Sequence, residues 1–200
     1  MRGIATGVIL VVAMASGFAA PVPKGLTAAD LFPLQMGNKW EYVDAKGQPS
    51  HVEEVTGIEE KDGAKVITVT RSRNGTAAMK SVYRVDKEGV SRVSVGPLEY
   101  SPPLLFVKPT VKEGEKWTAK LSIGKSDAEY EITVGKAEEI KVPAGTFTAI
   151  PVRQQNLRNK SSAPLEYWFA PNVGLVKSGT TRGLTTDLKA FTPGKADGKR

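Results

Sequence analysis

Residues 114–134 read GEKWTAKLSIGKSDAEYEITV. Apolar and polar side chains alternate along this stretch, with apolar residues at positions 117, 119, 121 and 123 and again at 130, 132 and 134. Successive side chains of a strand point to opposite faces, so this pattern predicts strands with one buried face. β-Branched residues cluster in the same way at 66–70 and 148–152, and no segment after residue 35 has a helical period. The sequence therefore predicts an all-β protein.

Glycine-containing turns separate the predicted strands. Asn-Gly and Asp-Gly pairs tolerate the positive φ angles of tight hairpins. The short spacing favours antiparallel neighbours over helix crossovers, and hence a meander. The turn candidates are Asp62-Gly63, Asn74-Gly75, Lys87-Glu88-Gly89 and Ala144-Gly145.

The Gly-x-Lys-Trp start of this stretch occurs twice, at residues 37–40 and 114–117. Later segments match in the same order, and the offset grows from 77 residues at the tryptophans to 85 at Gly89 and Gly174. Small loop insertions in a duplicated unit produce such a drift. We therefore interpret the chain as two tandem pseudo-repeats, 37–95 and 114–190, joined by a proline-containing linker, 96–113.

A single small meander leaves its apolar face in water and its edges unpaired. We therefore expect both repeats to form one β domain, residues 21–192, as a curved sheet, a half-barrel or a barrel of about ten strands. Thr27–Leu31 can form one helical turn that Pro33 ends. The polar segment 193–200 is expected to be a disordered basic tail.

The N-terminus has the pattern of a secretory signal peptide, residues 1–20. Arg2 precedes an apolar run from Ile4 to Ala13, and an Ala-x-Ala site follows at Ala13-Met14-Ala15. The alternative is an uncleaved anchor, but the run is shorter than the roughly 20 apolar residues that span a bilayer. We expect a soluble exported protein, periplasmic or extracellular, with no integral membrane segment after cleavage. The chain has no cysteine, so it is not lipidated on cysteine and has no disulfide.

The formal charge of +7 does not indicate nucleic-acid binding. Such binding favours clustered Lys and Arg with interleaved aromatic residues, whereas lysine and glutamate are interspersed along this chain. A mixed-charge surface is therefore expected.

Residues of the usual catalytic and metal sites are sparse. His51 is the only histidine, which excludes a multi-histidine metal site and a histidine-based triad. Adjacent glutamates, as at Glu59-Glu60, point to opposite faces of a strand and form no dyad. We expect no enzyme activity, no cofactor and no metal. Two acids from separate strands across a cleft, as in a carboxylate-based hydrolase, stay open as a less favoured alternative.

Five aromatic residues are candidates for contact with a ligand or partner: Trp40, Trp117, Tyr167, Trp168 and Phe169. The recurrence of the two Gly-x-Lys-Trp tryptophans favours a core anchor over an aromatic platform. Three consecutive aromatics at 167–169 place side chains on both faces of a strand. The outward one is either covered by the linker or the leader, which we favour, or exposed as a contact surface.

The combination of residues 32–40, VPAGTF at 142–147 and YWFAPNVGLVK at 167–177 resembles a family of uncharacterised exported bacterial proteins with a domain of unknown function, called TapB-like. The resemblance implies a curved antiparallel β domain in the cell envelope. It implies no catalytic residues.

Beside the less favoured hydrolase, two non-catalytic functions stay open at this point. The leading hypothesis is an exported non-catalytic protein that binds an apolar or lipid-like ligand in a concave sheet. The alternative is a structural or assembly module that contacts an envelope protein.

Overall fold

The computed structural model describes residues 25–159, 161–183 and 185–194. The predicted signal peptide, 1–20, lies outside the described residues, as do residues 195–200 of the predicted tail. In chain order the elements are α1 (Ala28–Leu31), β1 (Lys39–Asp44), β2 (Pro49–Lys61), β3 (Ala64–Arg73), β4 (Thr76–Asp86), β5 (Gly89–Val95), β6 (Leu98–Val107), β7 (Lys116–Ile123), β8 (Ser126–Val134), β9 (Glu138–Val142), β10 (Gly145–Asn156), β11 (Leu165–Ala170), β12 (Gly174–Thr180) and β13 (Thr185–Thr192).

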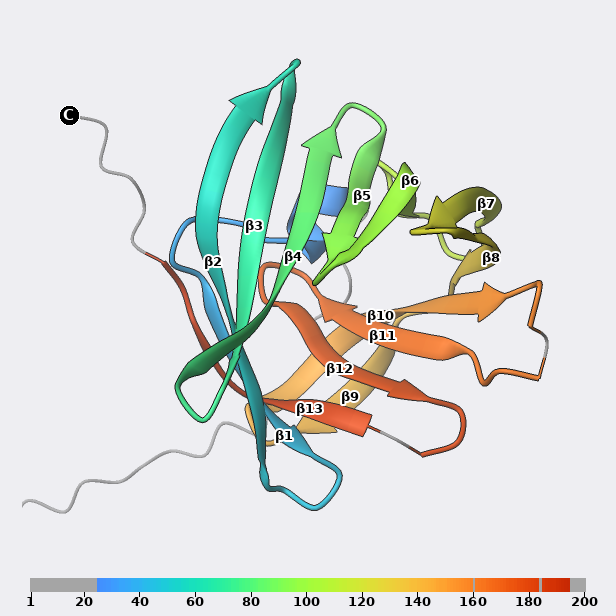
Figure 1. Cartoon of the computed structure of the whole chain (residues 1–200). Coiled ribbons are helices and arrows are strands. Elements are labelled where there is room, and N and C mark those ends of the chain that lie inside the picture. Colours follow the sequence, from blue (N-terminus) through green and yellow to red (C-terminus); the bar gives the residue numbers. More distant parts are fainter. Residues whose placement is uncertain (1–24, 160, 184, 195–200) are drawn as a thin grey trace, which may run out of the picture.

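The strands form a closed antiparallel barrel (Figure 1). All thirteen described strands belong to one sheet, and β10 pairs with both β8 and β11 while β13 pairs with β1. Twelve of these strands close the ring. The other one is β9, which among the described strands pairs only with the first part of β10. The predicted antiparallel meander is confirmed, and of the three predicted shapes the barrel is the observed one.

The strand number exceeds the expected ten or so for two physical reasons. Residues 98–107, which we expected to lie in a linker, form β6. Pro102 and Pro103 cannot donate backbone hydrogen bonds, and the β5–β6 register skips them between Arg92↔Leu104 and Ser94↔Glu99. The second reason is a break after Val134, which divides one long strand into β8 and β9.

The two Gly-x-Lys-Trp segments enter the sheet through the same backbone hydrogen bonds. In the first half Gly37 N donates to Val55 O, and Val55 N donates to Asn38 O. In the second half Gly114 N donates to Val134 O, and Val134 N donates to Glu115 O. Each of these four hydrogen bonds is 2.9 Å long. In both halves the lysine and tryptophan that follow are the first two residues of a strand, β1 or β7. The duplication itself stays a prediction.

The predicted helical turn is present as α1. Asp30 Oδ2 accepts hydrogen bonds from the Thr27 backbone N–H and hydroxyl, each 2.7 Å long, which ties the start of the turn together. Leu31 at its end is fully buried. α1 contacts β5 and β12, so the segment crosses from one side of the ring to the other.

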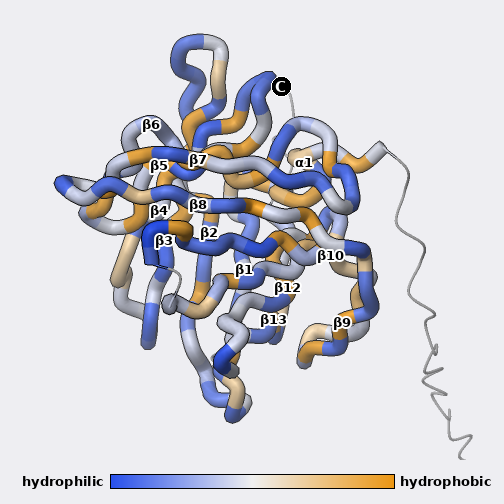
Figure 2. Tube along the Cα trace, turned by 90° about the vertical axis from the view of Figure 1, so that its right-hand side faces the viewer, coloured by the Kyte–Doolittle hydropathy of each residue, from blue (hydrophilic) through white to orange (hydrophobic). Residues whose placement is uncertain are grey.

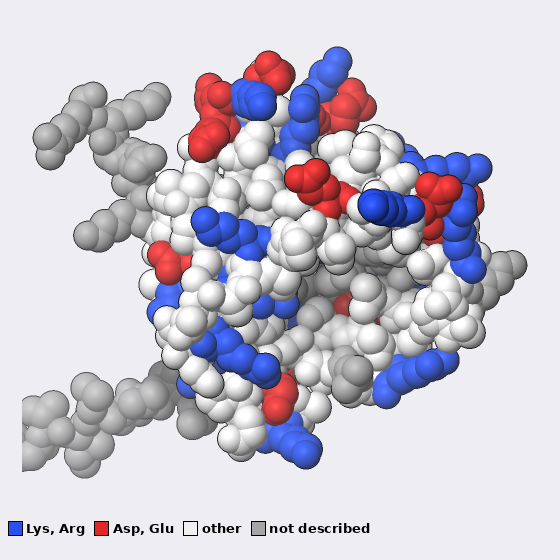
Figure 3. Space-filling model, viewed as in Figure 1, with Lys and Arg blue, Asp and Glu red and all other residues white. Residues whose placement is uncertain are grey.

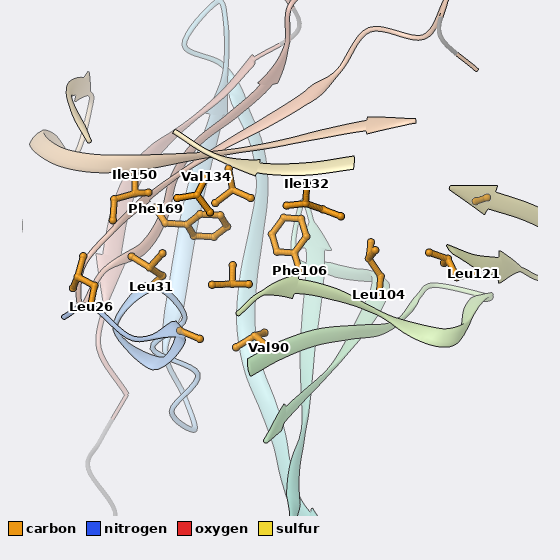
Figure 4. Packing of buried hydrophobic residues seen from close by; sticks show 14 residues of the cluster. Leu26, Leu31, Val90, Leu104, Phe106, Leu121, Ile132, Val134, Ile150 and Phe169 are labelled. Atoms are coloured by element: carbon orange, nitrogen blue, oxygen red, sulfur yellow. The ribbon is translucent and has the colours of Figure 1, made fainter. Parts of the chain in front are cut away.

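One buried cluster continues from α1 along the barrel interior. Figure 4 shows it as a row of side chains that runs through Leu26, Leu31, Phe169, Phe106, Leu104 and Leu121. Hydrophobic and hydrophilic residues alternate along strands such as β7 and β8 (Figure 2), as a half-buried sheet requires. Full burial of one leucine side chain such as Leu31 stabilises the fold by about 2 kcal/mol.

Gly89 lies where two chain segments come close together. Its φ is +120°, a conformation that side chains disfavour, and a Cβ there would collide with the carbonyl oxygen of Val107. The β4–β5 turn therefore requires glycine.

Within the described residues, α1 is far too short to cross a bilayer, and no other helix qualifies as a membrane span.

Candidate ligand site in the barrel

A cavity of about 90 Å³ lies inside the ring. Figure 3 shows a hollow near the centre of one face, between β6 and β10, with basic and acidic residues interspersed around it. Pockets for drug-sized ligands start at about 300 Å³, so this cavity holds a small molecule or one end of a larger one. Its lining comprises Leu31, Phe32, Pro33, Leu34, Trp40, Tyr42, Glu53, Val69, Arg71, Tyr83, Arg92, Phe106, Tyr167, Phe169, Gly174 and Leu175.

An aromatic cluster forms the apolar wall of the cavity. Phe32, which directly follows α1, lies 4.6 Å from Phe169 of β11 and 5.9 Å from Phe106 of β6, measured between ring centroids. Tyr167 meets Phe106 edge to face at 5.0 Å. Alternate residues of a strand share one face, so Tyr167 and Phe169 both reach the interior from β11.

A compact charged pair forms a second wall. Arg71 donates from Nη2 and Nε to the same oxygen of Glu53, at 2.6 and 3.0 Å. The two residues are cross-strand partners on β2 and β3, which fixes their side chains on one face. The Glu53 side chain is only 18% exposed, so Arg71 compensates a carboxylate that is largely removed from water.

His51 lies beside this pair without joining it as a charged partner. Its ring stacks on Tyr42 with centroids 4.8 Å apart, and its Nε2 is 3.8 Å from the Glu53 carboxylate. Burial, helped by the positive charge of Arg71, lowers the pKa of His51 to about 4. The imidazole is therefore neutral at neutral pH. Burial also raises the pKa of Tyr42 well above its usual value, and its hydroxyl donates to Leu175 O at 3.0 Å.

Arg92 of β5 is held by aromatic rings. Its guanidinium lies 4.8 Å from the centre of the Phe106 ring, 5.8 Å from that of Tyr83 and 5.9 Å from that of Tyr167. Such contacts attract a cation through the ring faces. The Nε atom is buried without a hydrogen-bond partner. Across the described ranges, no carboxylate comes within ion-pair distance of this guanidinium.

Three of the five candidate aromatics line the cavity: Trp40, Tyr167 and Phe169. Trp40 is buried, its ring stacks on Phe191 at 5.5 Å, and its Nε1–H donates to Val173 O at 2.6 Å. Its indole is thus fixed between β1, β13 and the turn before β12, with part of its surface facing the cavity.

Trp117 lies apart from the cavity. Its Nε1–H donates to Leu105 O at 3.0 Å, and the Lys108 ammonium lies 5.3 Å from its ring centre. The ring packs against the main buried cluster. These contacts hold β7 against β6, which gives Trp117 a packing role.

Trp168 points away from its two neighbours, as the alternation predicts. Its Nε1–H donates to Glu138 Oε1 at 2.5 Å, and the Lys177 ammonium lies 6.0 Å from its ring. Glu138 begins β9, so β9 lies against this side chain, whereas we expected the linker or the leader to cover it. Trp168 is half-buried.

Sequence reasoning missed the polar lining of the cavity. Charged residues on strands usually face water, so Glu53, Arg71 and Arg92 were not singled out. The sequence did contain one signal for them, because every second residue of a strand points to the same face. Arg71 continues the inward alternation of Ile67 and Val69, which are buried.

The described part of the chain contains no group of three or more His, Cys, Asp or Glu side chains that could hold a metal ion.

Two solved structures are similar to this chain. One is a protein from Bacteroides fragilis, described as exported and with a YmcC-like fold. It is 16% identical, with a TM-score of 0.44, and the match covers 80% of this chain and 97% of that one. The other, described as a lipoprotein, is from Parabacteroides distasonis. It is 17% identical, with a TM-score of 0.43, and the match covers 81% of this chain and 98% of that one.

No family model and no curated protein matches the chain. The resemblance to the TapB-like family therefore stays a prediction. Identity and TM-score are low for both solved structures, so the function is inferred from the residues of this chain alone.

Proposed function

We propose that this protein is an exported, non-catalytic binding protein whose barrel holds a small ligand with an apolar body. The observation that carries the proposal is the cavity inside the ring, with Phe32, Phe106 and Phe169 on its apolar wall. Ligand sites are mostly apolar hollows with a few convergent polar groups, and the Arg71–Glu53 pair and Arg92 supply such groups here.

The size of the cavity narrows the ligand class proposed from the sequence. A complete lipid tail exceeds about 90 Å³, so the ring as it stands takes a short apolar group. α1 limits the depth of the cavity because Leu31 and Phe32 occupy the interior at that point.

The lining also supports the non-catalytic part of the proposal. Glycoside hydrolysis by the usual route needs two carboxyl groups about 5 to 10 Å apart. Among the described residues that line the cavity, Glu53 is the only one with a carboxylate, and Arg71 binds it directly. Both hydrogen bonds from Arg71 go to one oxygen of this carboxylate, and no second acid lies opposite it among the described lining residues.

The alternative, an assembly module, has less support. Trp168 is the outward aromatic of the 167–169 run, and Glu138 already occupies its indole N–H. β9 has a partner on one side only among the described strands, and it carries Glu138, Glu139 and Lys141. Charged residues on an edge strand discourage pairing with another chain.

A titration with benzyl alcohol tests the proposal. This neutral probe has a small apolar body, and its binding is followed by NMR through the indole N–H signal of Trp40, which lines the cavity. We expect saturable shifts of this signal. Leu34 also lines the cavity and is partly exposed, so Leu34→Trp should fill the cavity and abolish the shifts.

A matched control is Leu98→Trp at an exposed position on β6 outside the lining. This variant should bind as the wild type does. Wild-type protein that shows no saturable shift up to the solubility limit of the probe would overturn the proposal. Equal binding by the Leu34→Trp variant would place the site elsewhere and overturn it as well.

A further inference from the structure

The charges that line the cavity do not balance. One carboxylate, that of Glu53, faces two guanidinium groups, those of Arg71 and Arg92. Arg71 and Glu53 neutralise each other through two hydrogen bonds. The lining therefore carries one uncompensated positive charge, and it belongs to Arg92.

The neighbours of Arg92 do not supply the missing negative charge. Its guanidinium lies among the rings of Phe106, Tyr83 and Tyr167, and the hydroxyls of these two tyrosines are its hydrogen-bond partners. Burial raises the pKa of Tyr83 against the opposing charge of Arg92, so this phenol stays neutral at physiological pH. Arg92 is thus a cation in an aromatic surrounding, with an unpartnered Nε and an open space beside it.

We infer that the ligand of this barrel is a small carboxylic acid in its anionic form, whose carboxylate pairs with Arg92 while its apolar body lies against Phe32, Phe106 and Phe169. This inference rests on the proposed function and adds the chemical class of the ligand. A buried unpaired charge is costly, and an anion that enters the cavity removes that cost. The structure thus favours a ligand with one negative charge.

A carboxylate fits this site better than a phosphate ester does. The planar fork of a guanidinium matches the two oxygens of a carboxylate. A single anionic charge balances the lining, whereas the second charge of a phosphate monoester would meet no free cation and would be repelled by Glu53. The small volume also favours the more compact group.

Three probes of similar shape test the inference: benzoate, benzyl alcohol and phenyl phosphate, titrated by NMR at pH 7. Hydrogen bonds to charged groups are worth about 1.5 to 3 kcal/mol, so benzoate should bind the wild type at least about tenfold tighter than benzyl alcohol. Phenyl phosphate should bind more weakly than benzoate.

The variant Arg92→Met keeps an unbranched apolar stem without the guanidinium and its charge, and the preference for benzoate over benzyl alcohol should fall to about one. Arg153 of β10 is exposed and outside the lining, so Arg153→Met should keep the wild-type preference. Arg92→Lys, which keeps the charge without the planar fork, should retain part of the preference and serves if Arg92→Met does not fold.

The outcomes separate this inference from the proposed function. Binding of benzyl alcohol with no preference for benzoate keeps the proposed function and overturns the inference, as does an undiminished preference in Arg92→Met. Tighter binding of phenyl phosphate than of benzoate overturns the carboxylate class. Absence of binding by all three probes overturns both.

Discussion

Replacement of His51 by glutamine should remove much of the acid sensitivity of this barrel. The folded protein holds the pKa of His51 at about 4, against 6.5 for an exposed histidine, chiefly through burial and secondarily through Arg71. Glu53 opposes this shift, and Arg73 adds to it. Between these two pH values the unfolded chain binds a proton at His51 that the folded chain excludes. The contribution of neutral His51 to the free energy of unfolding is therefore fully present above pH 6.5 and is lost as the pH falls towards 4.

The size of the effect follows from the difference of 2.5 pKa units between 6.5 and about 4. One unit corresponds to about 1.4 kcal/mol, so the complete loss is about 3.4 kcal/mol, of which about 2.5 kcal/mol is reached by pH 4.5. The His51 side chain is only 14% exposed, so solvent screening reduces this value little.

The assay is urea unfolding of wild type and His51→Gln at several pH values from 7.5 to 4.5. Carboxylates such as Asp86, whose pKa the Arg84 hydrogen bond lowers, titrate in both proteins and cancel in the difference. We expect the wild type to lose about 2.5 kcal/mol more than the variant over this range. Parallel stability curves, or a His51 pKa above 6 by NMR in the folded protein, would refute the reasoning.

Two further predictions concern backbone positions. Gly89→Ala should lower the free energy of unfolding by about 2 to 4 kcal/mol, because the new methyl group meets Val107 O at a φ of +120°. Gly63→Ala, with a φ of +70° and no atom within 4 Å of the new Cβ, should cost only about 1 kcal/mol; similar urea midpoints for the two variants would contradict this account. Asn38→Ala should cost about 2 to 4 kcal/mol, because the 2% exposed amide accepts a hydrogen bond from Gly194 N at 2.6 Å and donates another to a backbone carbonyl. Hydrogen exchange at the Gly194 amide should accelerate in this variant, and unchanged protection would argue against the role of Asn38.

The strands and turns of this barrel could be predicted because their signals are local. Alternation along residues 117–123 and 130–134 marks β7 and β8, and the glycine at 63 or 75 marks a hairpin. The local signal was misleading at Pro102-Pro103. In the sequence these prolines indicate the end of a strand, but in the sheet β6 continues through them because neither pairs with a residue of β5.

The closure of the ring and the composition of the site could not be predicted in the same way. Trp40 pairs with Phe191 across β1 and β13, and nothing near either residue specifies a partner 151 positions away. The tryptophans were recognised as large apolar anchors, but only the closed ring places Trp40, Tyr83 and Arg92 around one cavity. Arg92 lies on the inward face that Val90 defines, and its role depends on rings from β4, β6 and β11.

The pairing of the first strand with the last also sets the order of events during folding. Most neighbouring strands are joined by short turns and can pair as soon as both have been synthesised. β1 must wait for β13, so its outer edge stays open until nearly the whole domain has left the ribosome. Contacts of such sequence separation slow folding and expose an unpaired edge in the meantime. A nascent chain of this protein thus remains open for longer than its hairpins would suggest.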